Sequence, residues 1–209
     1  MKLILISPSD KRDTEIPFLL NMFEQGLQTY HVRKTKFSTK ELRNYLLQIP
    51  ERYHNRIVIH THHELVVQFN LKGIYISRSH KKRKMRTWLR MLWFRFKKRE
   101  LQVSATIRHT ENISDHESKY DYVFLSPVFD SLSGNFQAGF SEFNIKSALQ
   151  STKAQVIARG GISIDKIQKA HELGFAGVAF YTSIWKTNGP VQEFIKVKEK
   201  FDELNIPME

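Results

Sequence analysis

Short runs of apolar residues recur along the chain and alternate with segments of helical pattern. A run of about five apolar residues between polar turns is typical of a buried strand in a parallel sheet. Between two such runs, Phe18, Leu19, Met22 and Phe23 repeat at the spacing of one helix face. Eight runs are expected to form strands: Leu3–Ser7, Thr29–Arg33, Arg56–His60, Gly73–Ser77, Gln102–Ile107, Tyr122–Ser126, Gln155–Arg159 and Gly177–Tyr181.

Polar residues between these runs supply start and stop signals for helices. Ser38 and Glu41 have the spacing of a capping box, and Gly174 is placed as a helix-terminating glycine. The expected helices include Ile16–Leu27, one beginning after Ser38, Ile164–Leu173 capped by Ser163, and Val191–Leu204 after Gly189-Pro190. Eight strands that alternate with helices predict an α/β protein with a single (β/α)₈ TIM-barrel domain spanning residues 1–209.

Composition narrows the class of protein. The 209 residues are 41% hydrophobic and include no cysteine, which excludes disulfides and thiolate metal sites. The first apolar run is too short for the apolar region of a signal peptide. No run approaches the roughly 20 apolar residues of a membrane span. A cytoplasmic protein without a membrane span is therefore expected.

Positive charge is concentrated in one segment. Residues 79–100 contain ten Lys or Arg and one Glu, a local net charge of +9 that leaves +3 of the total +12 for the rest of the chain. The favoured interpretation is an amphipathic barrel helix whose cations are solvated or attract a phosphorylated substrate. Nucleic-acid binding is disfavoured but open, as is contact with a membrane or a partner. The same segment contains Trp88, Leu89, Leu92, Trp93 and Phe96, which have the spacing of one helix face.

The last two predicted strands end in groups that bind anions. The seventh is followed by Gly160 and Gly161, whose backbone N–H groups can approach a ligand closely. The eighth is followed by the hydroxyls of Thr182 and Ser183. In a (β/α)₈ barrel the loops after strands 7 and 8 often build a phosphate site. These residues therefore predict a phosphate-bearing ligand.

Cations and hydroxyls also follow the other strands. His31 and Arg33 are two residues apart, so they are expected on the same side of their strand. An anionic ligand at the carboxyl ends of the strands requires such groups. The set comprises His31, Arg33, Lys34, His60, Arg108, His109, Ser126, Ser131 and Arg159.

Three histidines and a glutamate follow the third strand: His60, His62, His63 and Glu64. His60 and His62 have same-face strand spacing, and imidazole is a good ligand for zinc or nickel. A metal site, a substrate-contacting histidine at the barrel rim and purely structural histidines are all compatible with this pattern. No metal site is assigned.

Taken in order, the motifs at the strand ends resemble those of the thiamine phosphate synthase and TenI family, whose members are (β/α)₈ barrels. The resemblance covers nearly the whole chain. Its specific part is the ordered series from the sixth strand to the eighth. The motifs are His31-Val32-Arg33-Lys34, Arg56-Ile57-Val58-Ile59-His60, Gly73-Ile74-Tyr75-Ile76, Asp121 to Phe129, Ala158-Arg159-Gly160-Gly161-Ile162, and Gly177 to Ser183.

The resemblance implies a place in thiamine biosynthesis. The family's synthase (thiamine-phosphate pyrophosphorylase) is a transferase that joins a pyrimidine diphosphate to a thiazole phosphate and releases pyrophosphate, with Mg²⁺ held by carboxylates. By motif, Arg33 matches the diphosphate-binding arginine. The hydroxyls of the loop after strand 6 match Ser131 and Ser133, and the thiazole phosphate site matches Gly161, Thr182 and Ser183.

The chain departs from the synthase pattern where Mg²⁺ is bound. The family's Asn-Asp pair falls on His60-Thr61, the second carboxylate falls near Ser79-His80, and a loop lysine falls on Gly134. Mg²⁺ is therefore expected only if synthase activity is retained, and no other cofactor is assigned. TenI-type relatives lack parts of this apparatus, and one activity among them is an isomerase reaction, tautomerisation of a thiazole carboxylate phosphate. Their catalytic histidine falls on Arg108, with His109 next.

A TenI-like tautomerase is slightly favoured over a synthase. A barrel that binds phosphate compounds, nucleic acid or a partner without catalysis is the third alternative. The expected ligands are a thiazole phosphate and, for a synthase, a pyrimidine diphosphate; a homodimer is compatible with the family. The candidate catalytic residues are Arg33, His60, Arg108 and His109. The candidate binding residues are His31, Lys34, Ser126, Ser131, Ser133, Arg159, Gly160, Gly161, Thr182 and Ser183.

Overall fold

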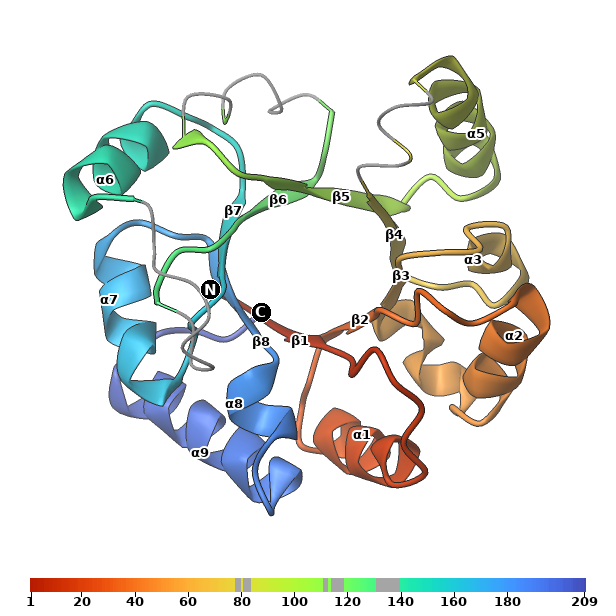
Figure 1. The fold of residues 1–209 in the computed structure, drawn as a ribbon, viewed down its shortest axis with the longest axis horizontal. Coiled ribbons are helices and arrows are strands. Elements are labelled where there is room, and N and C mark those ends of the chain that lie inside the picture. Colours follow the sequence, from red (N-terminus) through yellow and green to blue (C-terminus); the bar gives the residue numbers. More distant parts are fainter. Residues whose placement is uncertain (78–79, 81–83, 111–112, 114–118, 131–139) are drawn as a thin grey trace.

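Eight parallel strands close into a barrel in the computed structural model, which describes residues 1–77, 80, 84–110, 113, 119–130 and 140–209 (Figure 1). The eight predicted strands are confirmed, with ends that differ from the prediction by one residue at most. They are β1 (Lys2–Ile6), β2 (Thr29–Val32), β3 (Ile57–Ile59), β4 (Gly73–Ile76), β5 (Gln102–Ile107), β6 (Tyr122–Leu125), β7 (Val156–Arg159) and β8 (Gly177–Phe180).

Helices surround the barrel (Figure 1). The described α-helices are α1 (Glu15–Glu24), α2 (Thr39–Leu47), α3 (Leu65–Gln68), α5 (Lys84–Lys97), α6 (Glu142–Gln150), α7 (Ile167–Glu172), α8 (Thr182–Trp185) and α9 (Pro190–Glu203). Two 3₁₀ helices are η1 (Glu51–Arg56) and η4 (Ile164–Lys166). No helix in the described part of the chain is both long enough and apolar enough to cross a bilayer.

Two of the predicted helix signals are confirmed and one is wrong. The capping box of Ser38 and Glu41 is formed at the start of α2, and Gly174 adopts a positive φ of 93° after α7. The helix expected at 164–173 is divided into η4 and α7, and Ser163 makes no capping bond. Its hydroxyl donates instead to the side chain of Asp165, because a short acidic side chain two residues away competes with the backbone N–H groups.

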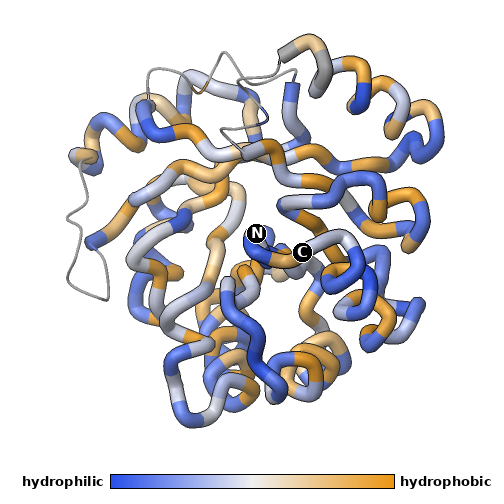
Figure 2. Tube along the Cα trace, turned by 45° about the vertical axis from the view of Figure 1, so that its right-hand side comes forward, coloured by the Kyte–Doolittle hydropathy of each residue, from blue (hydrophilic) through white to orange (hydrophobic). Residues whose placement is uncertain are grey.

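Side chains alternate along each strand between the barrel interior and the surrounding helices. The interior layer consists of Ile4, Ile6, Tyr122, Phe124, Ile157 and Ala179. A larger cluster fills the space between strands and helices. In Figure 2 the barrel strands are largely hydrophobic, whereas the helices around them mix hydrophobic and hydrophilic positions. By this alternation, Ser126, Arg159 and Tyr181 lie on the inner side of their strands, two residues beyond the interior layer.

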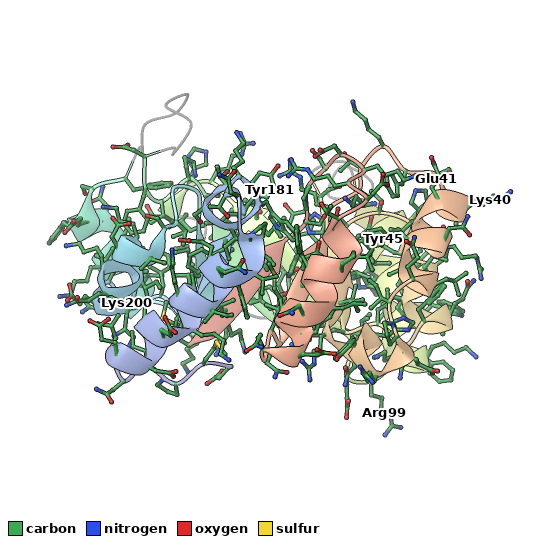
Figure 3. The ribbon with its side chains drawn as sticks, turned by 90° about the horizontal axis from the view of Figure 1, so that it is seen from below. Lys40, Glu41, Tyr45, Arg99, Tyr181 and Lys200 are labelled. Atoms are coloured by element: carbon green, nitrogen blue, oxygen red, sulfur yellow. The ribbon has the colours of Figure 1, made fainter. Side chains whose placement is uncertain are left out.

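All eight strands end at the same edge of the barrel because they are parallel. Figure 3 shows Tyr181, which directly follows β8, at this end, and Arg99, which precedes β5, at the other. The end that holds Tyr181 is therefore the mouth at which the predicted site residues gather.

Helix α5 forms within the basic segment, but its orientation differs from the expected one. Phe94 is buried at 2% exposure and Met91 packs against the core. The apolar residues singled out in the sequence lie on the other side and are about half exposed or more. α5 thus packs on the barrel between β4 and β5 as a barrel helix does, but it attaches through Phe94 and leaves the apolar face that the sequence singles out exposed.

Candidate functional site at the barrel mouth

The ends of β7 and β8 meet at one corner of the mouth. The hydroxyl of Ser183 donates to the carbonyl oxygen of Ile162 at 2.8 Å, which brings the first turn of α8 against the glycine turn after β7. The first N–H groups of a helix lack partners within it, so those of Thr182 and Ser183 are available to an anion. Gly161, Thr182 and Ser183 thus lie at the same corner, as the sequence predicts.

The glycine turn is fixed by its surroundings. Gly160 and Gly161 have positive φ values of 89° and 69°. A Cβ on Gly161 would lie 2.2 Å from the carbonyl oxygen of Asp130. The loop after β6 is held there by the N–H of Phe129, which donates to the carbonyl oxygen of Gly160 at 3.1 Å. Only glycine fits under this loop without a shift of the backbone.

Arg33 lies beside this corner. Its guanidinium carbon is 5.8 Å from the centre of the Tyr181 ring, and Tyr181 directly precedes Thr182. Its backbone N–H donates to the hydroxyl of Ser7 at 2.7 Å, which fixes the chain where β2 ends. Because β2 and β8 both neighbour β1, Arg33 approaches the phosphate corner from the adjacent wall of the barrel.

Arg159 occupies the inner side of β7, next to the centre of the mouth. Its guanidinium carbon lies 5.8 Å from the centre of the Phe124 ring, and one guanidinium nitrogen is 3.4 Å from the hydroxyl of Thr106. That hydroxyl also accepts a hydrogen bond from Tyr75 at 2.9 Å. Burial lowers the pKa of Arg159, and the charges of Arg33 and Arg108 lower it further.

The mouth therefore gathers three guanidinium groups, and those of Arg33 and Arg108 each repel that of Arg159. None of the three is paired with a carboxylate in the described part of the chain. The arginines that do form such pairs are Arg12, Arg52, Arg90 and Arg95. Of these, Arg12 also lies near the mouth, where it donates to the carbonyl oxygen of Trp185 in α8 at 3.2 Å. Cations that repel one another at the end of a barrel are arranged to receive an anion.

A chain of hydrogen bonds runs from the barrel interior toward the mouth. The Tyr122 hydroxyl lies 2.6 Å from Nε2 of His31. The other ring nitrogen of His31, Nδ1, lies 3.0 Å from Nε2 of His60. The His60 ring stacks on Tyr75 with ring centres 4.1 Å apart. His31 is thus an interior residue, and His60, which follows β3, is the member of the chain nearest the rim.

Burial keeps both histidines neutral. It lowers the pKa of His31 and of His60 well below 6.5, and the nearby charges of Arg159 and Arg33 add to the effect on His60. Burial also raises the pKa of Tyr122. A neutral imidazole has one N–H and one lone pair, so proton positions along the chain are coupled. At neutral pH, His60 is in the form that accepts a proton.

Lys34 lies on the outer side of the barrel. Its ammonium group forms a fully buried ion pair with Glu15 and donates to the carbonyl oxygen of Asp10 at 2.6 Å. The other carboxylate oxygen of Glu15 accepts hydrogen bonds from Tyr30 at 2.8 Å and Tyr45 at 2.6 Å. A role of Lys34 in phosphate binding stays a prediction. To bind phosphate, its ammonium group would have to give up its contacts with Glu15 and Asp10.

The remaining predicted residues lie at the rim. Arg108 and His109 are exposed after β5, and Ser126 is half-buried after β6. Ser126 joins Pro127 through a cis peptide bond, and its hydroxyl faces Gly160. Ser131 and Ser133 lie outside the described residues. The structure therefore brings Ser126 to the glycine turn and leaves His109 toward solvent.

The histidines after β3 point in different directions. His62 lies 2.8 Å from the Thr39 hydroxyl and donates to the carbonyl oxygen of Phe37 at 2.7 Å, outside the barrel. His63 is buried against His80 with ring centres 4.5 Å apart, and burial lowers its pKa to about 3. Among the described residues, no three His, Asp or Glu side chains gather as metal ligands.

The described donor set is a poor match for Mg²⁺. Mg²⁺ prefers carboxylate oxygens and water. At the position of the family's first carboxylate, the Thr61 hydroxyl is buried without a hydrogen-bond partner, and the adjoining group is the imidazole of His60. Glu64 is engaged by Arg90 at 3.3 Å. These side chains do not form the carboxylate pair that holds a diphosphate-bound Mg²⁺.

Four residues at the site were not predicted from the sequence: Tyr75, Thr106, Tyr122 and Tyr181. Strand alternation is the signal that could have found them, since each occupies a position whose side chain points to the inner side of its strand. In the sequence, Tyr122 and Tyr75 cannot be told from aromatic residues that only pack within a strand. Their hydroxyl contacts arise only from barrel closure.

Comparisons with known proteins agree with this architecture. The sequence model of the family described as thiamine monophosphate synthase matches residues 3–184. Comparison with curated protein sequences gives no match. A thiamine phosphate pyrophosphorylase from Bacteroides thetaiotaomicron is 25% identical, with a TM-score of 0.76 over 97% of this chain and 98% of that one.

Two other solved structures share the fold at lower identity. A thiamine phosphate pyrophosphorylase from Pyrococcus furiosus is 13% identical, with a TM-score of 0.75 over 97% of this chain and 96% of that one. A 3-hexulose-6-phosphate synthase from Salmonella typhimurium is 16% identical, with a TM-score of 0.69 over 99% of this chain and 100% of that one.

Proposed function

The chain belongs to the thiamine monophosphate synthase family, and we propose that it binds a thiazole carboxylate phosphate across the barrel mouth and catalyses its tautomerisation. The observation that carries this proposal is the set of three guanidinium groups at the mouth, from Arg33, Arg108 and Arg159, without a described carboxylate partner. A ligand with two anionic groups matches this distribution of charge better than a ligand with one.

The phosphate end of the ligand is assigned to the corner between β7 and β8. The turn of Gly160 and Gly161 and the first N–H groups of α8, those of Thr182 and Ser183, are the backbone donors that we assign to it. Arg33 adds a cation from the adjacent wall. Since the Ser183 hydroxyl donates to Ile162, we expect phosphate to be held mainly by backbone N–H groups and the guanidinium.

The carboxylate end is assigned to Arg159 and Arg108. Arg159 is held by the Phe124 ring and the Thr106 hydroxyl, which orient its guanidinium before any ligand arrives. Because burial and the neighbouring arginines lower the pKa of Arg159, an incoming carboxylate relieves repulsion as well as adding charge-assisted hydrogen bonds. This second anionic contact distinguishes the thiazole carboxylate phosphate from a thiazole phosphate that lacks the carboxylate.

His60 is assigned as the general base and acid. Tautomerisation takes a proton from one atom of the substrate and returns a proton to another, with no net redox change or loss of a group. A neutral His60 accepts the proton at its lone pair and becomes an imidazolium. Arg33 and Arg159 destabilise that cation, so the proton is returned readily. His31 and Tyr122 fix the orientation of the ring.

Thiamine phosphate synthesis is the second candidate function. The same guanidinium groups can stabilise a departing pyrophosphate, and membership of the thiamine monophosphate synthase family favours this activity. The mismatch between the described side chains and Mg²⁺ counts against it. The two functions differ in products, since only the synthase releases pyrophosphate and requires the pyrimidine diphosphate.

The test combines two assays on the purified protein. Tautomerisation in D₂O is followed by NMR as uptake of deuterium into the thiazole carboxylate phosphate. Pyrophosphate release from pyrimidine diphosphate plus thiazole phosphate is measured with and without Mg²⁺. We expect catalysed deuterium uptake that persists in EDTA, and a fall of roughly 10²- to 10⁴-fold in His60→Gln.

His171→Gln is the matched control, because His171 is exposed on α7, and it should retain the wild-type rate. A rate that His60→Gln leaves unchanged, or that His109→Gln abolishes instead, overturns the assignment of His60. Mg²⁺-dependent pyrophosphate release without catalysed deuterium uptake replaces the tautomerase with the synthase.

A further inference from the structure

Helix α5 exposes a continuous stripe of apolar side chains that the barrel does not use. The exposed fractions range from 49% to 82%. Successive members are one or three residues apart, so they lie along the same side of the helix. We call these six side chains the outer stripe: Met85, Trp88, Leu89, Leu92, Trp93 and Phe96.

The opposite side of α5 attaches the helix to the protein. Phe94 is buried at 2% exposure and Met91 packs against the core. The Thr87 hydroxyl donates to the carbonyl oxygen of His80 at 2.8 Å. These contacts attach α5 to the barrel without using the outer stripe. Exposed apolar patches of this kind are uncommon on monomeric proteins and mark interaction surfaces.

Cationic side chains border the outer stripe on both sides. Arg90 and Lys97 are three residues before and four residues after Trp93, and Arg95 is three residues after Leu92. Arg90 and Arg95 are about two-fifths exposed and are each paired with a carboxylate, Glu64 and Asp121 respectively. Lys97 is exposed. The stripe thus lies within the segment whose local net charge is +9.

We propose that the outer stripe docks α5 onto the surface of an anionic lipid bilayer. A helix that lies in the membrane interface places Trp, Phe and Leu on its apolar side, with Lys and Arg along the borders, where they reach acidic headgroups. The outer stripe has this arrangement. Trp88 and Trp93 supply the amphipathic rings that favour the headgroup level.

Charge distinguishes this occupant from the alternatives. A second copy of the chain would bring two segments of +9 together around the stripe, and that repulsion opposes self-association. Nucleic acid would satisfy the cations but would leave the aliphatic side chains Met85, Leu89 and Leu92 without an apolar partner. An anionic bilayer satisfies both the cations and the apolar side chains.

Docking through α5 leaves the barrel mouth accessible. Figure 1 shows the barrel nearly end-on, with α5 at its periphery beside β4 and β5. A bilayer that contacts the outer stripe therefore lies against the side of the barrel, and ligand binding at the mouth should continue on the membrane.

The test is co-sedimentation of the full chain with vesicles, together with tryptophan fluorescence. The neutral vesicles consist of phosphatidylcholine alone, and the anionic vesicles of phosphatidylcholine mixed with phosphatidylserine. Trp185, the third tryptophan, is buried at 4% exposure, so a blue shift on vesicle addition reports Trp88 and Trp93. We expect binding and a blue shift only with the anionic vesicles, and a decrease in both as salt is added.

Variants of exposed residues test the stripe without disturbing the core. Trp93→Ser combined with Phe96→Ser should weaken vesicle binding at least about tenfold. Lys97→Gln should weaken it about fivefold, the effect of one cation near an acidic surface. Phe143, 80% exposed on α6, and Lys40, exposed on α2, provide the matched controls. Phe143→Ser and Lys40→Gln should bind like the wild type.

Several outcomes overturn the proposal. One is the absence of binding to anionic vesicles at low ionic strength. Another is equal binding by the Trp93/Phe96 double variant, which would make the interaction one of charge alone. A dimer that the same double variant dissociates would show that a second copy covers the stripe. RNA binding that this variant weakens, with no vesicle binding, would assign the stripe to nucleic acid.

Discussion

Arg33 and Lys34 are adjacent cations at the end of β2, yet they serve opposite sides of the barrel. Arg33 lies at the mouth beside Tyr181 and pairs with no carboxylate in the described chain. Lys34 is fully buried on the outer side, where Glu15 neutralises it. Their difference comes from strand alternation, which sends successive side chains to opposite faces.

This contrast separates two kinds of buried polar group. The outer group of Glu15, Lys34, Tyr30 and Tyr45 satisfies its charges internally, so it contributes to folding and offers nothing to a ligand. The mouth holds arginines that repel one another and a neutral histidine pair. Its electrostatics are completed only by an anion. We therefore expect variants of the outer group to change stability, and variants of the mouth to change binding.

The largest expected effect on stability is that of Lys34→Met. Removing the ammonium leaves the Glu15 carboxylate buried without its counter-charge, which should lower the free energy of unfolding by roughly 3–5 kcal/mol. Urea denaturation measures this change. Lys40→Met on the exposed part of α2 is the control and should stay within about 0.5 kcal/mol. A Lys34→Met variant of wild-type stability that fails to bind ligand would reverse the roles of the two cations.

The next effect is that of Gly161→Ala, which acts on the phosphate corner. Alanine at a φ of 69° is strained, and its Cβ would meet the Asp130 carbonyl oxygen at 2.2 Å. The turn must shift, and we expect the affinity for thiazole phosphate, measured by calorimetry, to fall at least about tenfold, since backbone donors hold the phosphate.

Gly174→Ala provides the matched control for Gly161→Ala. Gly174 also has a positive φ, 93°, but its added Cβ would meet nothing closer than a Leu149 carbon at 4.0 Å. Gly174→Ala should lose about 1–2 kcal/mol of stability through backbone strain. Gly161→Ala should lose more, because its Cβ also meets the backbone of the loop after β6, and only Gly161→Ala should lose affinity. Equal affinities in the two variants would remove the glycine turn from the binding site.

Arg33→Gln tests the cation at the mouth, in contrast to the buried Lys34. Loss of a charge-assisted hydrogen bond to the ligand should weaken binding by about 1.5–3 kcal/mol, or roughly 10- to 150-fold. The free energy of unfolding should change by less than about 1 kcal/mol, because no carboxylate is left unpaired. Arg52→Gln, at an exposed arginine near η1, controls for general loss of positive charge. Undiminished affinity in Arg33→Gln would contradict the assignment.

The last prediction concerns the pH dependence of stability. The pKa of His60 lies well below 6.5 in the folded protein because the ring is buried. The unfolded chain therefore binds protons first as the pH falls. Stability should be fully present above pH 6.5 and decline below it, by up to about 1.4 kcal/mol per pH unit for each buried histidine.

Unfolding in urea between pH 7.5 and pH 5 measures this slope. His60→Gln should make it shallower, whereas His171→Gln should not, because His171 is exposed. The same slope in wild type and His60→Gln would mean that His60 is protonated as readily in the folded state as in the unfolded state.

The barrel was largely predictable from the sequence, because each parallel strand is a short apolar run with a sharp end. Gly160, Gly161, Thr182 and Ser183 were predictable for the same reason, since the topology of a (β/α)₈ barrel brings the last two strand ends together. Strand parity also placed His31 and Arg33 on the same side. These inferences depend on local pattern and on topology alone.

Other features depend on partners that are distant in the sequence. The role of Lys34 is decided by Glu15, and that of His31 by Tyr122 and His60. The orientation of α5 could not be predicted from the hydrophobic pattern either, because the helix has apolar residues on two sides: Phe94 on one and the outer stripe on the other. Periodicity identifies an apolar face but does not tell which of two faces the barrel will bury.

Calorimetric titration of the wild-type protein with thiazole carboxylate phosphate in EDTA tests the central claim most directly. If the guanidinium groups and the glycine turn complete the anion site, one equivalent should bind, added Mg²⁺ should leave the affinity unchanged, and a thiazole phosphate without the carboxylate should bind more weakly. Binding that requires Mg²⁺, or no preference for the carboxylate, would contradict the account.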